Sequence, residues 1–438
     1  MAFRNFDDDL QISRRSLLRG GGYLAAGAAL AGLPVNAFAQ VAGRREWPAV
    51  TAMIESFVRS RQVVNMQVAF GENRADPYAI ARGEVNSGSG AVADIDSLYR
   101  IYSMTKPITG MAAMMLIDDG KLGLDQPISQ LLPAFAKMRV LKSANGPLED
   151  TVPAERPITV RHLMTHTAGL GYDIITKGPL LQAYMANGIS GGQLSRVPIP
   201  GVPQFKSAPG LEVWADRLAT LPLIAQPGTK WSYSIGLDLL GRVIEVASGQ
   251  SLSSFLEERL FGPCGMTSTF FRVPQSEATR LTDNYGMLAG IAIPVDLGES
   301  SIYLDTPPVE WGGSGIVCSP RDYDRFLKML LGFGMLDGKR VMGELAVRVG
   351  TSNLLPRGVN TKGTWVEGQG MGAGGRSVEG TFGWGGAAGT LASVDYRNGL
   401  RMGLFTQYMP AEALPVRDRF IAAVLQDLGQ TGREVKVG

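Results

Sequence analysis

Histidine and cysteine are scarce in this sequence: two of each occur in 438 residues. Their positions show no ligand spacing of the kind that zinc sites use, so we expect no metal. The net charge is also small, because 42 Lys and Arg face 40 Asp and Glu. A chain so close to neutral lacks the basic surface that would make nucleic acid or an anionic membrane its main partner. The 56 glycines and 25 prolines follow no fixed period, which excludes collagen-like and solenoid folds.

The sequence also lacks hydrophobic runs long enough to span a membrane. A shorter apolar stretch near the N-terminus has the features of an export signal. Residues 20–33 are uncharged and weakly hydrophobic, too short for a bilayer core that takes about 20 residues to cross. Arg14 and Arg15 precede this stretch, and residues 37–39 supply a small-x-small cleavage pattern. This order resembles a bacterial twin-arginine export signal. We predict a signal at residues 1–39 and a periplasmic or secreted mature protein with no stable membrane span. A basic N-terminal helix of the mature domain is the alternative.

The two cysteines, Cys264 and Cys318, lie 54 positions apart in the mature chain. The twin-arginine route carries proteins that have already folded in the cytoplasm, so a disulfide is not needed for folding. We therefore expect two separate buried thiols rather than a bridge.

Two expected β-hairpins lie near the chain ends, where apolar residues flank turn-rich segments. They comprise residues 63–70 with 78–81 and residues 390–396 with 400–407. Helical spacing of apolar residues marks residues 105–119, 158–164, 237–246, 252–261 and 411–428. We expect residues 40–438 to form one antiparallel sheet subdomain from both ends (about 40–100 and 290–438), with a mainly helical subdomain (about 101–289) inserted between. Two sequential domains would leave each end with a two-stranded ribbon, which is marginal alone.

One serine hydrolase motif fails on its context. Residues 188–192 match G-x-S-x-G, a turn that needs a strand before it and a histidine later in the chain. No convincing strand precedes Ser190, and both His162 and His166 come before it. The histidines share a helical face, but no glutamate lies between them where metalloproteases keep their base. We interpret the match as accidental and expect both histidines to form local hydrogen bonds that fix the helix end at Gly169.

With histidine excluded as the base, Ser103 has another candidate one helical turn later. Residues at i and i+3 share a helical face, so the amine of Lys106 can reach the Ser103 hydroxyl. A lysine in a desolvated, partly cationic pocket loses its proton readily and can then take one from serine. A position in the first helical turn also favours negative charge developing on Ser103. We predict Ser103 as the nucleophile and Lys106 as its base.

Several segments, in their order along the chain, carry a resemblance to a known family. They are residues 99–109, 116–128, 163–170, 226–234 and 312–316 followed by 321–323. Together they resemble serine β-lactamase-related hydrolases of the class C branch, over about residues 50 to 425. The resemblance implies the β-lactamase/DD-peptidase-like fold of the α/β (α+β) class, an antiparallel sheet flanked by helices with an inserted mainly helical domain. It implies no metal or organic cofactor.

The resemblance also assigns a second acid/base and a specificity position. Tyr233 falls on the tyrosine of the family's Tyr-x-Asn motif, and a phenol beside a lysine is a plausible proton carrier. Ile235 replaces the motif's Asn, which is associated with binding the amide side of a β-lactam. The loss of that polar contact disfavours amides relative to esters. Because the change resembles family VIII carboxylesterases, we predict that Ile235 contributes to substrate binding.

The third family motif is Trp-Gly-Gly in many of those esterases, and two copies compete here. Trp384, Gly385 and Gly386 precede the C-terminal hairpin as the family order requires, whereas residues 311–313 match a separate glycine-rich segment. We therefore assign substrate binding to the copy at residues 384–386, whose glycines let a substrate approach the backbone. The N–H of Ala387, with that of the nucleophilic serine, would then form the oxyanion hole.

These observations predict an exported serine carboxylesterase. Ser103 would attack small carboxylic esters with Lys106 and Tyr233 as acid/base, and the acyl-enzyme would pass its acyl group to water or an alcohol. The alternatives are a class C-like β-lactamase or D-amino-acid peptidase with the same three residues, and a non-catalytic sensor of acyl ligands. The expected partner is a small-molecule ester or a β-lactam.

Overall fold

The computed structural model describes residues 45–199, 206–288 and 291–429. Residues from Pro48 onward form one compact unit, and of the unit before them the structure describes only residues 45–47. The predicted export signal at residues 1–39 lies outside the described residues and stays a prediction.

The main sheet joins the two ends of this unit. Its seven strands pair in the order β12-β13-β14-β15-β16-β1-β2, and every neighbouring pair is antiparallel. β1 from the N-terminal hairpin pairs with β16 from the C-terminal hairpin, which places Val68 opposite Leu404. The strands of this sheet are β1 (Asn65–Glu72), β2 (Tyr78–Gly83), β12 (Gly370–Met371), β13 (Arg376–Val378), β14 (Thr381–Gly385), β15 (Leu391–Asp395) and β16 (Leu400–Phe405). Both predicted hairpins and the sheet built from them are confirmed.

Within the described residues, other strands form four smaller sheets. They pair as β3-β9-β6, β17-β7-β8, β10-β11 and β4-β5. The bounds are β3 (Tyr99–Arg100), β4 (Arg139–Leu141), β5 (Thr151–Pro153), β6 (Thr269–Phe270), β7 (Asn284–Leu288), β8 (Ile291–Asp296), β9 (Val317–Cys318), β10 (Met335–Leu336), β11 (Lys339–Arg340) and β17 (Tyr408–Met409). The subdomain boundary predicted near residue 290 falls between the paired strands β7 and β8, and both strands belong to the compact unit that starts at Pro48.

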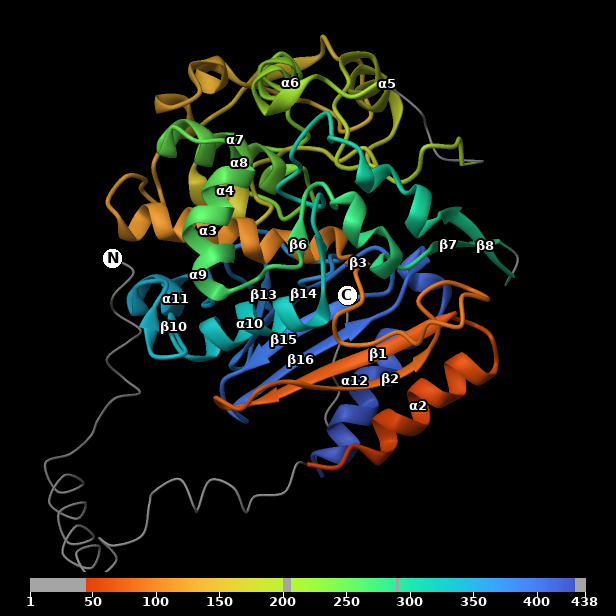
Figure 1. The fold of residues 1–438 in the computed structure, drawn as a ribbon. Helices are drawn as coiled ribbons and strands as arrows, with labels where there is room; N and C mark the ends of the chain where they lie inside the picture. The colour runs from red at the N-terminus through yellow and green to blue at the C-terminus, as the bar shows by residue number, and fades with distance from the viewer. Residues whose placement is uncertain (1–44, 200–205, 289–290, 430–438) are drawn as a thin grey trace, which may run out of the picture. The chain divides into compact units, whose positions relative to one another are not determined.

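Helices cover both faces of the main sheet (Figure 1). α10 packs against β1, β15 and β16, while α2 packs against β1, β2 and α12 on the opposite face. α10 starts sharply because the Ser319 side chain caps it and Pro320 is its first residue. The helices are α2 (Pro48–Arg59), α3 (Thr105–Asp118), α4 (Val160–Met164), α5 (Gly178–Asn187), α6 (Gly210–Ala219), α7 (Gly236–Ser248), α8 (Leu252–Leu256), α9 (Gly262–Cys264), α10 (Pro320–Leu331), α11 (Glu344–Gly350) and α12 (Val416–Asp427).

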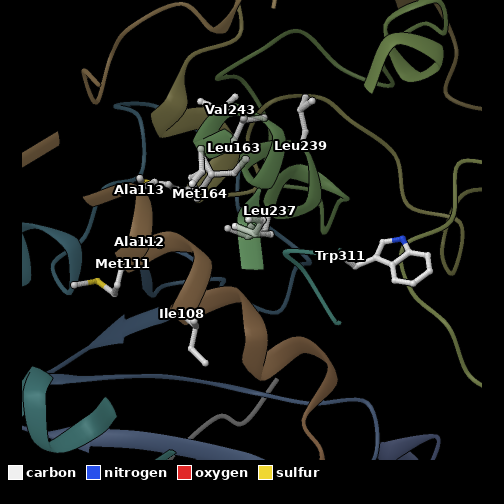
Figure 2. Close-up of a cluster of buried hydrophobic side chains, with 14 of the residues drawn as sticks. Ile108, Met111, Ala112, Ala113, Leu163, Met164, Leu237, Leu239, Val243 and Trp311 are labelled. Atoms are coloured by element: carbon white, nitrogen blue, oxygen red, sulfur yellow. The ribbon is translucent and has the colours of Figure 1, made fainter. Parts of the chain in front are cut away.

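α3 runs through the interior, and its residues from Thr105 to Leu116 are all buried. A helix that is apolar on most sides needs neighbours on most sides, and α7, α11 and the strand β14 supply them. Figure 2 shows this packing, in which apolar side chains of α3, α4 and α7 meet. The labelled members are Ile108, Met111, Ala112, Ala113, Leu163, Met164, Leu237, Leu239, Val243 and Trp311.

Two helix boundaries differ from the prediction by five residues, and the other differences are of one or two residues. The C-terminal helix begins at Val416 rather than at residue 411, because Pro410 and Pro415 restrict the backbone before it. Residues 252–261 form α8 only as far as Leu256 and continue as a π-helical turn, Glu257–Phe261. Cys264 and Cys318 are free and buried, as predicted. Among the described helices, none is both long and apolar enough to cross a membrane.

A buried ion pair holds the strand that leads to Ser103. Arg100 of β3 donates from Nε to Asp296 Oδ2 at 2.7 Å, and both side chains are almost completely buried. Asp296 also accepts hydrogen bonds from the Ser301 hydroxyl (2.6 Å) and the Ile302 N–H (3.0 Å). The guanidinium is therefore neutralised and hydrogen-bonded, which a buried cation requires.

We expect Asp296→Ala to lower the free energy of unfolding by about 3–5 kcal/mol, because it leaves the Arg100 cation buried without its anion. Glu344→Ala is the matched control, since it removes the solvent-exposed pair that Glu344 forms with Arg348. That variant should cost at most about 1 kcal/mol. Urea denaturation measures both, and equal losses would contradict the assignment.

Candidate active site

Ser103 lies in a 3₁₀ turn, Tyr102–Met104, directly before α3. The preceding residue, Tyr102, has a φ of +41°, a conformation that costs free energy for a residue with a side chain. Its hydroxyl accepts a hydrogen bond from Asn284 Nδ2 at 3.0 Å, and its ring packs edge-on against Tyr303. These contacts hold the turn in a strained form that presents Ser103 at the helix N-terminus.

Lys106 lies one turn further along, and its side chain is completely buried. Its Nζ donates to Ser103 Oγ at 3.1 Å and to the Gly313 carbonyl at 2.7 Å. The structure thus brings together the predicted nucleophile and base. A buried amine with two fixed acceptors has little freedom to leave the serine.

Tyr233 reaches the same oxygen from the segment before α7. Its hydroxyl donates to Ser103 Oγ at 2.7 Å, across 130 positions of sequence. Lys106 Nζ lies 4.8 Å from the centroid of the Tyr233 ring. Over the described part of the chain, Lys106 and Tyr233 are the only side chains hydrogen-bonded to Ser103 Oγ. The arrangement allows either group to exchange a proton with the serine.

Both Trp-Gly-Gly copies lie at the site, with different contacts. In the copy assigned to substrate binding, Trp384 of β14 stacks on Tyr233 with ring centroids 5.9 Å apart. A Cβ on Gly386 would lie 2.2 Å from the Ile101 carbonyl oxygen, so this strand end passes close to the serine turn. In the parts of the chain the structure describes, the Ala387 N–H has no hydrogen-bond acceptor. The oxyanion hole stays a prediction that this geometry allows.

The second copy, residues 311–313, contacts the base. Gly313 accepts the Lys106 hydrogen bond, and its N–H donates to Asp238 Oδ1 at 2.8 Å. A Cβ on Gly313 would lie 2.7 Å from Asp238 Oδ2, so this close approach requires glycine. Our sequence prediction missed Asp238. The sequence does contain an indication of its role, because Asp238 is a single carboxylate among apolar residues in the first turn of a helix.

Asp238 is completely buried, and burial raises its pKa to about 7 although the positive charge of Lys106 opposes the shift. Its carboxylate reaches the lysine only through the Gly313 peptide group. Asp238 is therefore a positioning residue for the site, held between α7 and the segment after Trp311.

The structure places Ile235 in the core next to the site. Its side chain is completely buried in the hydrophobic core, and its N–H donates to the Gly171 carbonyl at 3.2 Å. Lys106 is equally buried, so the predicted part of Ile235 in substrate binding stays a prediction. Ile235 also closes the start of α7, two residues after Tyr233.

We expected both histidines to form local hydrogen bonds at the C-terminal end of the helix. Only His162 forms such a bond, and it does so at the N-terminal end of α4. His162 closes the N-terminus of α4: its Nδ1 accepts from the Thr159 N–H at 3.2 Å. Gly169, where we expected the anchor, lies beyond the helix with a φ of +78°. Burial lowers the pKa of His162 to about 4, so the ring is neutral.

His166 makes a long-range contact that the sequence did not suggest. Its Nδ1 accepts from the Ser234 N–H at 3.2 Å, and its ring lies 4.8 Å from the Tyr233 ring. Burial, assisted by the charge of Lys106, lowers the pKa of His166 well below its ordinary value. The neutral imidazole therefore packs behind Tyr233 and supports it from the core side.

The rejected serine motif has a structural role. Ser190 Oγ hydrogen-bonds to Ser207 Oγ at 2.6 Å, and the Ser190 carbonyl accepts from the indoles of Trp214 (3.1 Å) and Trp311 (2.8 Å). Gly188 ends α5 in a left-handed conformation. This serine ties the loop to the core. Among the described residues, no three His, Cys, Asp or Glu side chains gather as a metal site would require.

Known proteins resemble this chain in sequence and in fold. A family model described as Beta-lactamase matches residues 50–426. Protein Rv1367c of Mycobacterium tuberculosis is 39% identical over 256 residues, which cover 58% of this chain and 59% of that protein. Esterase EstB of Burkholderia gladioli is 30% identical over 292 residues, covering 64% of this chain and 68% of EstB. The match to the first of these relatives thus spans less than two thirds of its length.

Among solved structures, EstCE1, described as a hydrolase with promiscuous acyltransferase activity, has a TM-score of 0.67 and 24% identity. The match covers 85% of this chain and 97% of EstCE1. At this identity the similarity establishes the fold. It confirms the predicted β-lactamase/DD-peptidase-like class with its antiparallel sheet and helices.

The raised pKa of Asp238 predicts how the free energy of unfolding changes with pH. Its pKa is 3.8 in an unfolded reference and about 7 in the fold, so between these values the folded protein holds a proton that the unfolded chain has lost. Stability from this group is therefore lost as pH rises. Asp238→Asn cannot ionise and still offers an oxygen to the Gly313 N–H. From about pH 5 to 7.5, we expect the wild type to lose about 2 kcal/mol relative to this variant. Urea denaturation at each pH tests this, and a constant difference would contradict it.

Proposed function

The chain belongs to the beta-lactamase family, and from this premise we propose that it is a serine esterase that forms an acyl-enzyme on Ser103. The family is a serine hydrolase superfamily that includes esterases and acyltransferases. The observation that carries the proposal is the double hydrogen bond at Ser103 Oγ, from Lys106 at 3.1 Å and from Tyr233 at 2.7 Å. A serine oxygen held by an amine and a phenol has two groups able to move its proton.

In the proposed reaction, the serine proton passes to the Lys106 amine as Oγ attacks the ester carbonyl carbon. The N–H groups of Ser103 and Ala387 would stabilise the tetrahedral oxyanion, by up to about 4 kcal/mol for one donor. Tyr233 then gives its hydroxyl proton to the leaving alcohol as the C–O bond to that alcohol breaks, and Lys106 passes the serine proton on to the phenolate. The acyl-enzyme is hydrolysed by water, or an alcohol accepts the acyl group in its place.

An ester is favoured over a β-lactam on two grounds. EstB, one of the relatives that this chain resembles, is an esterase. In addition, the position two residues after Tyr233 holds a buried Ile235, so no side-chain amide is available there for a lactam. A site that lacks this polar contact loses part of its preference for amides over esters.

We expect Ser103→Ala and Lys106→Ala to abolish ester turnover while circular dichroism stays native. Tyr233→Phe should lower kcat by about 10²- to 10⁴-fold, the range of a lost general acid/base. Intact mass spectrometry with p-nitrophenyl acetate should detect an acetyl adduct on the wild type and none on Ser103→Ala. Wild-type turnover by Tyr233→Phe would remove that residue from the mechanism.

A substrate panel separates the ester proposal from its alternatives. We expect kcat/KM for p-nitrophenyl acetate or butyrate to exceed that for nitrocefin and for D-Ala-D-Ala peptides. The reverse order by a factor of ten or more, about 1.4 kcal/mol of transition-state stabilisation, would favour a β-lactamase or peptidase. An acyl adduct that forms and never turns over would instead favour a sensor of acyl ligands.

A further inference from the structure

Trp365 is a half-exposed tryptophan that lies directly against the ring of Tyr233. The ring centroids are 4.8 Å apart, and the planes are tilted by 52°. Trp365 is 45% exposed, whereas Trp384 and Trp231, which also neighbour Tyr233, are 7% and 3% exposed. Single exposed apolar side chains are common on proteins and need no function. Trp365 differs from such side chains because it lies beside Tyr233, the proposed acid/base.

The loop that carries Trp365 is anchored to the segment that carries Tyr233. Asn360 and this segment exchange two backbone hydrogen bonds: Asn360 accepts from the Trp231 N–H and donates to the Thr229 carbonyl, both at 2.9 Å. The next residue after the tryptophan, Val366, is completely buried and fixes the loop to the core. Trp365 therefore keeps its place relative to Tyr233 without a ligand, and binding against it loses little conformational entropy.

Hydrogen bonds on the far side of the loop complete this support. The Trp365 carbonyl accepts from Arg376 Nη2 at 3.1 Å, and the Gly363 N–H donates to Glu367 Oε2 at 2.8 Å. With its backbone held at both ends, the indole offers a rigid apolar surface beside the phenol. Flat or bulky apolar groups pack well on such a surface, by tilted or offset ring contacts.

The proposed function indicates which part of an ester comes to this surface, and the inference rests on it. The carbonyl must face Ser103 Oγ and the N–H of Ala387, whereas the alcohol oxygen must reach the Tyr233 hydroxyl to receive its proton. A group attached to that oxygen therefore starts beside Tyr233, whose ring Trp365 contacts. We propose that Trp365 binds the alcohol portion of the substrate and selects esters of aromatic or bulky apolar alcohols. The same surface would bind such an alcohol when it acts as the acyl acceptor.

Two series of esters test this assignment. In the first, the acyl group is always acetyl and the alcohol is 2-naphthol, phenol or ethanol; in the second, the alcohol is always p-nitrophenol and the acyl chain runs from acetyl to hexanoyl. We expect Trp365→Ala to lower kcat/KM for 2-naphthyl acetate about tenfold, and that for ethyl acetate by about twofold at most. Acyl-chain preference should not change, and Trp365→Phe should retain most of the activity on 2-naphthyl acetate.

Lys362→Ala is the matched control, because Lys362 is an exposed residue of the same loop. It should leave both series unchanged. An equal loss on naphthyl and ethyl acetate would mean that Trp365 supports Tyr233 rather than the substrate, and a change in acyl-chain preference would place it at the acyl side. Either result overturns the inference. The proposed function fails separately, if the wild type forms no acyl adduct on Ser103 with any of these esters.

Discussion

Burial of the first three turns of α3 is the constraint on which the site depends. Because α7, α11 and β14 surround this helix, Lys106 has no water to solvate its amine and must find acceptors within the protein. It finds two, Ser103 Oγ and the Gly313 carbonyl. The contact that we propose for catalysis therefore also supplies a hydrogen-bond acceptor to the buried amine, beside the Gly313 carbonyl.

Asp238, the acidic neighbour of this lysine, does not contact Lys106 directly. In the described part of the chain Lys106 forms no ion pair, and Asp238 reaches it only through the Gly313 peptide group. A direct carboxylate contact would stabilise the ammonium form, which cannot accept a proton. Here Asp238 holds the Gly313 peptide group, and the Gly313 carbonyl positions Lys106 Nζ without a direct contact between the two charged side chains. The close approach requires glycine at position 313, which explains why the second Trp-Gly-Gly copy has a structural part to play.

Around this centre, aromatic rings from distant segments enclose Tyr233. His166 and Trp384 pack against it from buried positions, whereas Trp365 meets it from the exposed side. Tyr233 itself is only 5% exposed, so the surface that a ligand can reach on this side belongs to Trp365. This asymmetry distinguishes residues that support the tyrosine from the one that we propose contacts the substrate.

Local patterns were enough for the hairpins, for the helical turn that joins Ser103 to Lys106, and for the fold class, because these depend on spacing along the chain and on ordered motifs. They were not enough for Asp238 or His166, or for the burial of Ile235. Each of these depends on which distant segments pack together. A side chain such as Ile235 reads as a substrate contact in a motif and as core in three dimensions, because burial is a property of the neighbours and not of the residue.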